Sequence, residues 1–147
     1  MNTEENTTGT FSDFEKEAMR NRAKELKAEA KASKNKEEGE KMATDAINGM
    51  TGDDKVLAQK VHELVKKAAP DLMAKTWYGM PAYADKEGKV VCFFQPGDKF
   101  KARYSTLGFN DAAKLDEGNM WATSYGLLKI TATEEEMITK LVKKAVA

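Results

Sequence analysis

Cysteine, histidine and recognisable catalytic motifs are scarce or missing in this sequence of 147 residues. With one cysteine and one histidine, the chain cannot form an intramolecular disulfide or build a zinc site of the usual Cys and His type. The motifs Gly-x-Gly-x-x-Gly, Gly-x-Ser-x-Gly and His-Glu-x-x-His do not occur. No nucleophile stands beside a recognisable base, so we expect a protein that is not an enzyme.

Net charge and long apolar runs are also absent. The chain has 24 basic and 24 acidic residues, a formal net charge of +0. No global field then attracts nucleic acid or an anionic membrane, and nucleic acid ranks low among the expected partners. No apolar run approaches the ~20 residues that span a bilayer, and no signal peptide is recognisable at the start. We therefore expect a cytoplasmic protein without a membrane partner.

The N-terminal third of the chain is polar and highly charged. Residues 1–10 are small and polar without periodicity, which predicts a disordered tail. Residues 11–50 are rich in Glu, Lys and Ala with a thin apolar stripe, which predicts a charged helical extension with a break over 34–39. Such a helix either stays solvated or becomes ordered against a protein partner or another copy of the chain.

Residues 51–147 are expected to form the folded domain. A strongly amphipathic helix is predicted over 56–68, and a capping box of Thr133 and Glu136 predicts the start of the last helix. Between these helices the patterns predict strands over 82–85, 89–95 and 99–107, a short helix over 110–116, and one more strand within 119–130. Hairpin connections between grouped strands indicate an α+β fold, an antiparallel sheet of about four to five strands packed by helices.

The stretch Thr76–Tyr83 is the densest in aromatic and turn-forming residues. Three aromatics, a methionine, a glycine and a proline within eight residues are costly to expose, so the stretch lines either a core or a pocket. We predict a pocket for a small molecule, in which a glycine lets the backbone approach the ligand and a basic residue contacts an anion. A structural core is the alternative interpretation. The predicted pocket residues are Trp77, Tyr78, Gly79, Met80, Pro81, Phe94, Arg103 and Trp121.

Several polar or reactive residues have both a functional and a purely structural interpretation. Lys99, Lys101 and Arg103 alternate along a predicted strand and form either an anion-binding ridge or an ordinary solvated strand face. His62 lies at the flank of its predicted helix, where a partly satisfied surface histidine is a simpler interpretation than a catalytic base or metal ligand. Cys92 lies in an apolar strand and is interpreted as a buried small hydrophobe and not a reactive thiol.

The run Ala69–Ala84, APDLMAKTWYGMPAYA, resembles the YdhG-like domain family, and the likeness continues through 89–95, 101–109 and Met120–Trp121. It spans roughly 53–147 and implies a single compact α+β domain. Most members are uncharacterised, and one branch is described as a frataxin-like iron chaperone that delivers iron to heme or iron–sulfur assembly. For this chain the resemblance implies iron held by carboxylates. The acids nearest the shared motifs are Asp85, Glu87, Asp98, Asp111, Asp116 and Glu117.

Three hypotheses of function result. The first is a non-catalytic cytoplasmic binding domain of unknown ligand, with an aromatic-lined pocket for a small molecule. The second is an intracellular iron-binding chaperone that uses surface carboxylates. The third is a protein-interaction module that pairs through residues 11–50 with another protein or with itself. The sequence names neither a ligand nor a cofactor, and iron is the one metal that the resemblance brings forward.

Overall fold

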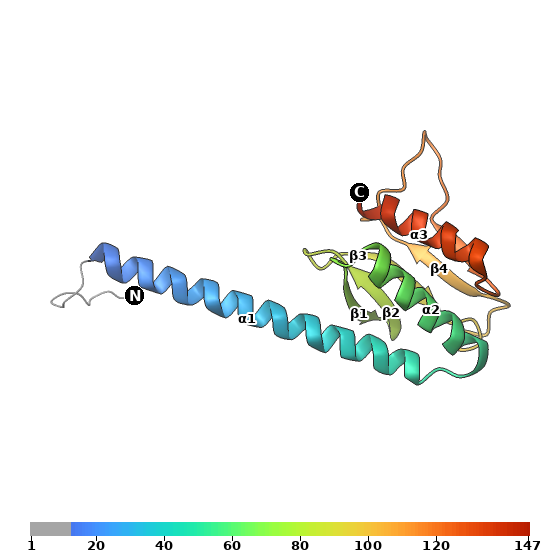
Figure 1. The fold of residues 1–147 in the computed structure, drawn as a ribbon, viewed down its shortest axis with the longest axis horizontal. Helices are drawn as coiled ribbons and strands as arrows, with labels where there is room; N and C mark the ends of the chain where they lie inside the picture. The colour runs from blue at the N-terminus through green and yellow to red at the C-terminus, as the bar shows by residue number, and fades with distance from the viewer. Residues whose placement is uncertain (1–12) are drawn as a thin grey trace. The chain divides into compact units, whose positions relative to one another are not determined.

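A computed structural model describes residues 13–147 (Figure 1), so the disordered tail predicted at 1–10 lies outside the described residues. The chain divides into two units between Asn35 and Lys36, and the second, Lys36–Ala147, is the compact domain. The helices are α1 Asp13–Asn48, α2 Gly52–Ala68 and α3 Ala132–Val146. The strands are β1 Met73–Trp77, β2 Met80–Ala84, β3 Val90–Gln95, β4 Ser105–Phe109 and β5 Ser124–Leu127.

The five strands form one antiparallel sheet in the order β1-β2-β3-β4-β5, so each strand pairs with its neighbours in the chain. This confirms the predicted α+β fold and its antiparallel sheet. The strand β3 is the middle one, as its apolar character on both faces predicts. The predicted hairpin turn before it also forms, because Gly88 takes a φ of 85° and its N–H donates to the Asp85 carbonyl at 2.9 Å.

The core lies between one face of the sheet and the helices. Strand register places Tyr83, Phe94 and Leu107 on this helix-covered face, and all three are fully buried. Figure 1 shows α2 and α3 in front of the sheet. The buried side chains of the helices belong to the same core cluster: Ala43 and Ile47 of α1, Leu57, Val61, Leu64 and Val65 of α2, and Ile138 and Val142 of α3.

The first helix differs from the prediction. A break was expected over 34–39, but α1 is helical from Asp13 to Asn48, and its residues from Lys36 onward belong to the compact domain. Gly39, which suggested the break, instead lies against the backbone carbonyl of Ala74, where a Cβ atom would collide with the oxygen. The glycine therefore allows close approach of helix and strand, and about a third of the predicted extension, 36–48, packs as part of the domain.

Three shorter predictions are wrong. Residues 99–104 are not part of a strand, since β4 begins only at Ser105 and the preceding residues form a turn whose alternation imitates a strand. Residues 110–116 form a turn and extended chain in place of a helix. The last helix begins two residues earlier than expected, because Thr131 is its N-cap and Glu134 completes the capping box; both threonines have a glutamate three residues later.

Candidate ligand-binding site on the open face of the sheet

The second face of the sheet carries no helix of the compact domain. Register places Lys75, Trp77, Phe93, Gln95 and Thr106 on this face, and each is half-buried, whereas their neighbours on the helix-covered face are mostly buried. The helix residues of the core cluster all pack on the opposite side, together with Tyr83 and Phe94. We call the surface formed by these five residues and their register partners the open face.

Two aromatic rings meet on the open face. The ring centroids of Trp77 and Phe93 are 5.1 Å apart, although the residues come from β1 and β3. On the strand between them, the buried Met80 pairs with Trp77 and the small Ala82 pairs with Phe93. The Phe93 ring extends over β4 at Gly108, where a Cβ atom would collide with it. Small residues under large rings thus create a broad aromatic surface that stays partly exposed to solvent.

A third ring continues the surface toward the other edge of the sheet. The Tyr104 ring lies against Gly126, where a Cβ atom would be 3.0 Å from the ring. The guanidinium carbon of Arg103 is 5.1 Å from the centroid of that ring, a cation–π arrangement. Gln95, Thr106 and Gly126 are aligned in register between this ring and the Trp77 side. The open face therefore offers rings with polar groups between them.

The turn between β1 and β2 forms one end of the open face. Tyr78 and Gly79 are its two central residues, with φ of 51° and 78°, the combination of a type I′ hairpin turn. Such turns favour Asn, Asp and Gly at the first position because a Cβ is crowded there. Tyr78 is 82% exposed, and its ring centroid is 5.0 Å from that of Trp77 in an edge-on arrangement.

The connection between β3 and β4, which we call the basic loop (residues 96–104), borders the same end. The Gly97 N–H donates to the Ser105 hydroxyl at 2.9 Å, and that hydroxyl donates to the buried carboxylate of Asp54 at 3.3 Å. The Asp98 N–H also donates to the Asp54 carboxylate at 3.3 Å. A Cβ atom at Gly97 would be 2.8 Å from the Tyr104 carbonyl group. These contacts hold the loop from the core side.

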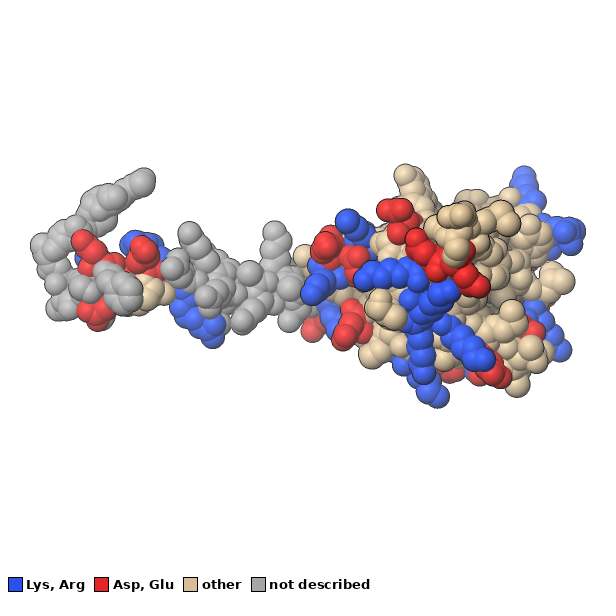
Figure 2. All heavy atoms as spheres, turned by 90° about the horizontal axis from the view of Figure 1, so that it is seen from above, with Lys and Arg blue, Asp and Glu red and all other residues tan. Residues whose placement is uncertain are grey.

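Ion pairs engage part of the basic residues on the helix side. Lys60 pairs with Glu63 at 2.9 Å and Lys66 with Glu40 at 2.8 Å. Figure 2 shows basic and acidic side chains interspersed over one view of the compact domain. Around the open face, no ion pair among the side chains that the structure describes engages any of four basic residues, which are Lys75, Lys99, Lys101 and Arg103.

The structure brings together only part of the predicted pocket. Trp77, Tyr78 and Gly79 lie together at the hairpin, with Met80 buried beside them and paired in register with Trp77. Pro81 and Phe94 are fully buried on the helix-covered face. Trp121 lies before β5, at the opposite edge of the sheet from β1, and is 38% exposed. Arg103 lies in the basic loop beside Tyr104.

Sequence reasoning missed Phe93 as a site residue. The two phenylalanines are adjacent in β3 and lie on opposite faces; the predicted pocket included Phe94, whereas the ring next to Trp77 is that of Phe93. Register with β2 would have found it, because Phe93 pairs with Ala82 and Ala82 pairs with Lys75 on the strand that holds Trp77. That register depends on the hairpin at Tyr78 and Gly79 that joins β1 to β2, and the sequence patterns predicted no strand before residue 82.

A partly buried chain of hydrogen bonds on the helix-covered side was missed as well. His62 Nδ1 is 2.8 Å from the Tyr83 hydroxyl, and His62 Nε2 is 2.7 Å from Glu40, whose other carboxylate oxygen accepts from Lys66 at 2.8 Å. Burial raises the pKa of Glu40, but hydrogen bonds from Lys66 and His62 outweigh it and hold the pKa below its ordinary value. His62 is thus the partly satisfied histidine that was expected, although Tyr83 is too deeply buried to meet a substrate.

The structure also bears on the predicted state of Cys92 and on metal binding. Cys92 is fully buried and burial raises its pKa to about 12, which confirms a buried hydrophobe in place of a reactive thiol. In the part of the chain that the structure describes, no three His, Cys, Asp or Glu side chains come together in a way that would hold a metal ion. Nor is any helix among the described residues long and apolar enough to cross a membrane.

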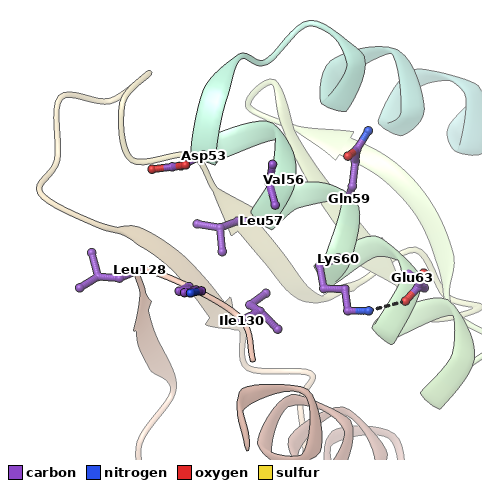
Figure 3. A pocket seen from close by; sticks show the side chains of 9 residues that line it. Asp53, Val56, Leu57, Gln59, Lys60, Glu63, Leu128 and Ile130 are labelled. Atoms are coloured by element: carbon purple, nitrogen blue, oxygen red, sulfur yellow. Dashed lines mark hydrogen bonds and ion pairs between the residues drawn. The ribbon is translucent and has the colours of Figure 1, made fainter. Parts of the chain in front are cut away.

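Apart from the open face, a surface pocket lies between α2 and the segment that follows β5 (Figure 3), with a volume of about 500 Å³. Leu57 and Ile130 line it together with the exposed Val56 and Leu128. On its wall Lys60 is engaged by Glu63 at 2.9 Å and by Glu135 at 3.3 Å. This basic side chain is therefore already neutralised, whereas those around the open face are not.

Comparisons with protein-family models, with curated proteins and with solved structures found no match to this chain. The resemblance to the YdhG-like family therefore stays a prediction.

Proposed function

We propose that this chain is a binding domain that takes up a small planar molecule on the open face of its sheet. The observation that carries the proposal is the Trp77 and Phe93 pair, two rings in contact that remain half-buried on a face that carries no helix of the compact domain. A planar ligand stacked on them would remove apolar ring surface from water. Covering ~100 Å² of such surface contributes about 2.5 kcal/mol on the protein side, and the ligand's own buried ring surface adds to it.

The proposal keeps the cytoplasmic, non-catalytic binding domain expected from sequence and changes the location of its site. A pocket enclosing Trp77, Phe94 and Trp121 is replaced by an exposed surface built from Trp77 and Phe93. The iron-chaperone hypothesis and the pairing of residues 11–50 stay predictions, because no observation on the described residues favours either of them.

The indole N–H signals of the two tryptophans test this proposal directly. In a ¹⁵N-labelled protein each tryptophan gives one such signal, and Trp121→Phe assigns them. Titration with 2-naphthamide, a neutral planar probe, is expected to shift the Trp77 signal saturably and leave the Trp121 signal in place. Trp121 therefore serves as an internal control for unspecific adsorption, since it is also partly exposed.

A variant separates stacking from folding. Phe93→Leu keeps an apolar side chain over Gly108 but removes the second ring, so we expect weaker binding of 2-naphthamide with little change in the unfolding midpoint. Shifts of both indole signals in parallel, or no shift of the Trp77 signal at millimolar probe, would overturn the proposed function.

A further inference from the structure

We infer that the two turns at the Trp77 end of the open face form an anion subsite, so that the ligand is a planar ring carrying a carboxylate, sulfonate or phosphate group. The turns are the Tyr78–Gly79 hairpin and the basic loop. This inference rests on the proposed function and names the chemical class of its ligand. Three observations support it: backbone strain, proximity and unpaired charge.

The strain is confined to these two turns. Within residues 13–147, Tyr78 and Lys101 are the non-glycine residues with positive φ, at 51° and 56°. L-residues with a Cβ adopt this region rarely, and glycine or asparagine occupies it more readily. Strained residues of this kind persist where the surroundings fix them, and they gather at ligand sites. Tyr78 and Lys101 thus occupy backbone conformations that glycine would adopt with less strain.

The two turns are neighbours in space. A Cβ atom built on Gly79 would be 3.7 Å from the Lys99 Nζ, so the ammonium lies directly beside the hairpin tip that carries Tyr78. The basic loop is also fixed internally: the Lys101 N–H donates to the Asp98 carbonyl at 3.1 Å and the Ala102 N–H to the Gly97 carbonyl at 2.9 Å. This is the bonding of a helix-end turn closed by one left-handed residue. The subsite is therefore held in place before a ligand arrives.

The charge around the subsite fits an anion. Register places one charged residue among the strand residues of the open face, the basic Lys75, while Lys99, Lys101 and Arg103 lie in the adjoining loop. The loop has one acid, Asp98. Because no ion pair in the described part of the chain uses these basic groups, a ligand anion would not have to displace a carboxylate. The net charge of +0 favours a small anion over a polynucleotide.

A matched pair of probes tests the inference apart from the proposed function. The carboxylate 2-naphthoate and its neutral amide 2-naphthamide share one ring system, and both are followed through the Trp77 indole signal. We expect the naphthoate to bind at least about fivefold more tightly at low salt, with the difference shrinking as salt is added. Equal affinities would overturn the anion subsite and leave the proposed function standing. If neither probe shifts the signal, the proposed function fails.

Two substitutions locate the subsite. Lys99→Gln should reduce the advantage of 2-naphthoate over 2-naphthamide by about fivefold, the effect of losing one exposed ion pair, and leave 2-naphthamide binding unchanged. Lys101→Asn removes a basic group, so it should weaken naphthoate binding. Because asparagine tolerates positive φ better than lysine, the same substitution should raise the melting temperature. Lys86→Gln, in the turn between β2 and β3 at the other end of the sheet, is the matched control and should change neither.

Two outcomes of these tests would contradict the inference. If Lys99→Gln and Lys86→Gln weakened naphthoate binding equally, the effect would be one of general charge. If the oligonucleotide (dT)₁₀ bound with a steep salt dependence and more tightly than 2-naphthoate, the surface would be one for single-stranded nucleic acid and the assignment to a small ligand would be wrong.

Discussion

The Nδ1 atom of His62 lies 2.8 Å from the hydroxyl oxygen of Tyr83, which links α2 to the second strand of the sheet. Burial raises the pKa of Tyr83 well above its ordinary value, so the hydroxyl stays protonated and donates a hydrogen bond to the histidine ring. In the neutral imidazole Nδ1 is then the acceptor, and the ring N–H is on Nε2, from which it donates to Glu40 in α1. The tautomer of His62 is thus assigned by its two partners, and the chain of bonds joins three elements.

Tyr83→Phe removes this link without changing the shape of the core. The His62 nitrogen would lose its donor in a half-buried place, so we expect a loss of about 1–3 kcal/mol in the free energy of unfolding. Urea titrations measure it, with Tyr78→Phe as control, because the Tyr78 side chain is largely exposed and its substitution should have no effect. A Tyr83→Phe protein as stable as the wild type would contradict the assigned bond.

The lowered pKa of Glu40 predicts that the stability of the protein depends on pH. Its pKa is lower in the folded than in the unfolded chain, since hydrogen bonds from Lys66 and His62 outweigh the raising effect of burial. The stabilisation is then complete above the unfolded pKa of about 4.3 and is lost as the pH falls through the folded pKa. Glu40→Gln should therefore be less stable than the wild type at pH 7, and the difference should shrink between pH 5 and pH 3.

Urea midpoints measured from pH 7 to pH 3 test this expectation. Glu136→Gln is the matched control: it also removes a carboxylate paired with a lysine, but one on the surface of α3. Its difference from the wild type should stay small at every pH. If the stability difference caused by Glu40→Gln were the same at pH 3 as at pH 7, the pKa of Glu40 would not be lowered by folding.

Most of the architecture could be predicted from local patterns. The helix α2 has a one-sided apolar face, the turn before β3 has a glycine at the position that needs positive φ, and β3 is apolar on both faces. The open face could not be predicted from local patterns, because it depends on which residues of β1, β2 and β3 pair with one another. Likewise, the partners of His62 lie 21 and 22 residues away in the sequence, a separation without a periodic signature.

Gly39 shows where local propensity points in the wrong direction. Glycine disfavours a helix interior by about 1 kcal/mol relative to alanine, and the expected break over 34–39 ends at this glycine. Here its missing Cβ lets α1 approach the Ala74 carbonyl of β1. Propensity alone predicts that Gly39→Ala stabilises the protein. We expect the opposite, a loss of about 1–3 kcal/mol, because the Cβ would meet backbone atoms that cannot rotate away.

Thermal unfolding followed by circular dichroism measures this effect. Gly49→Ala is the control, since a Cβ there would be 3.5 Å from the Asp45 carbonyl oxygen, an ordinary contact, and it should change stability little. A Gly39→Ala protein that melts above the wild type would mean that α1 does not pack closely on β1.

The start of the domain gives the last prediction. Sequence patterns place it at residue 51, whereas the compact unit begins at Lys36 and includes Ala43 and Ile47 in its core. A chain of residues 36–147 should therefore unfold cooperatively, near the midpoint of the full chain. A chain of residues 51–147 lacks these buried side chains and the Glu40 partner of His62, so it should lose at least about 3 kcal/mol of stability. Denaturation of the two truncated proteins under identical conditions compares them, and equal stabilities would place the boundary at residue 51 after all.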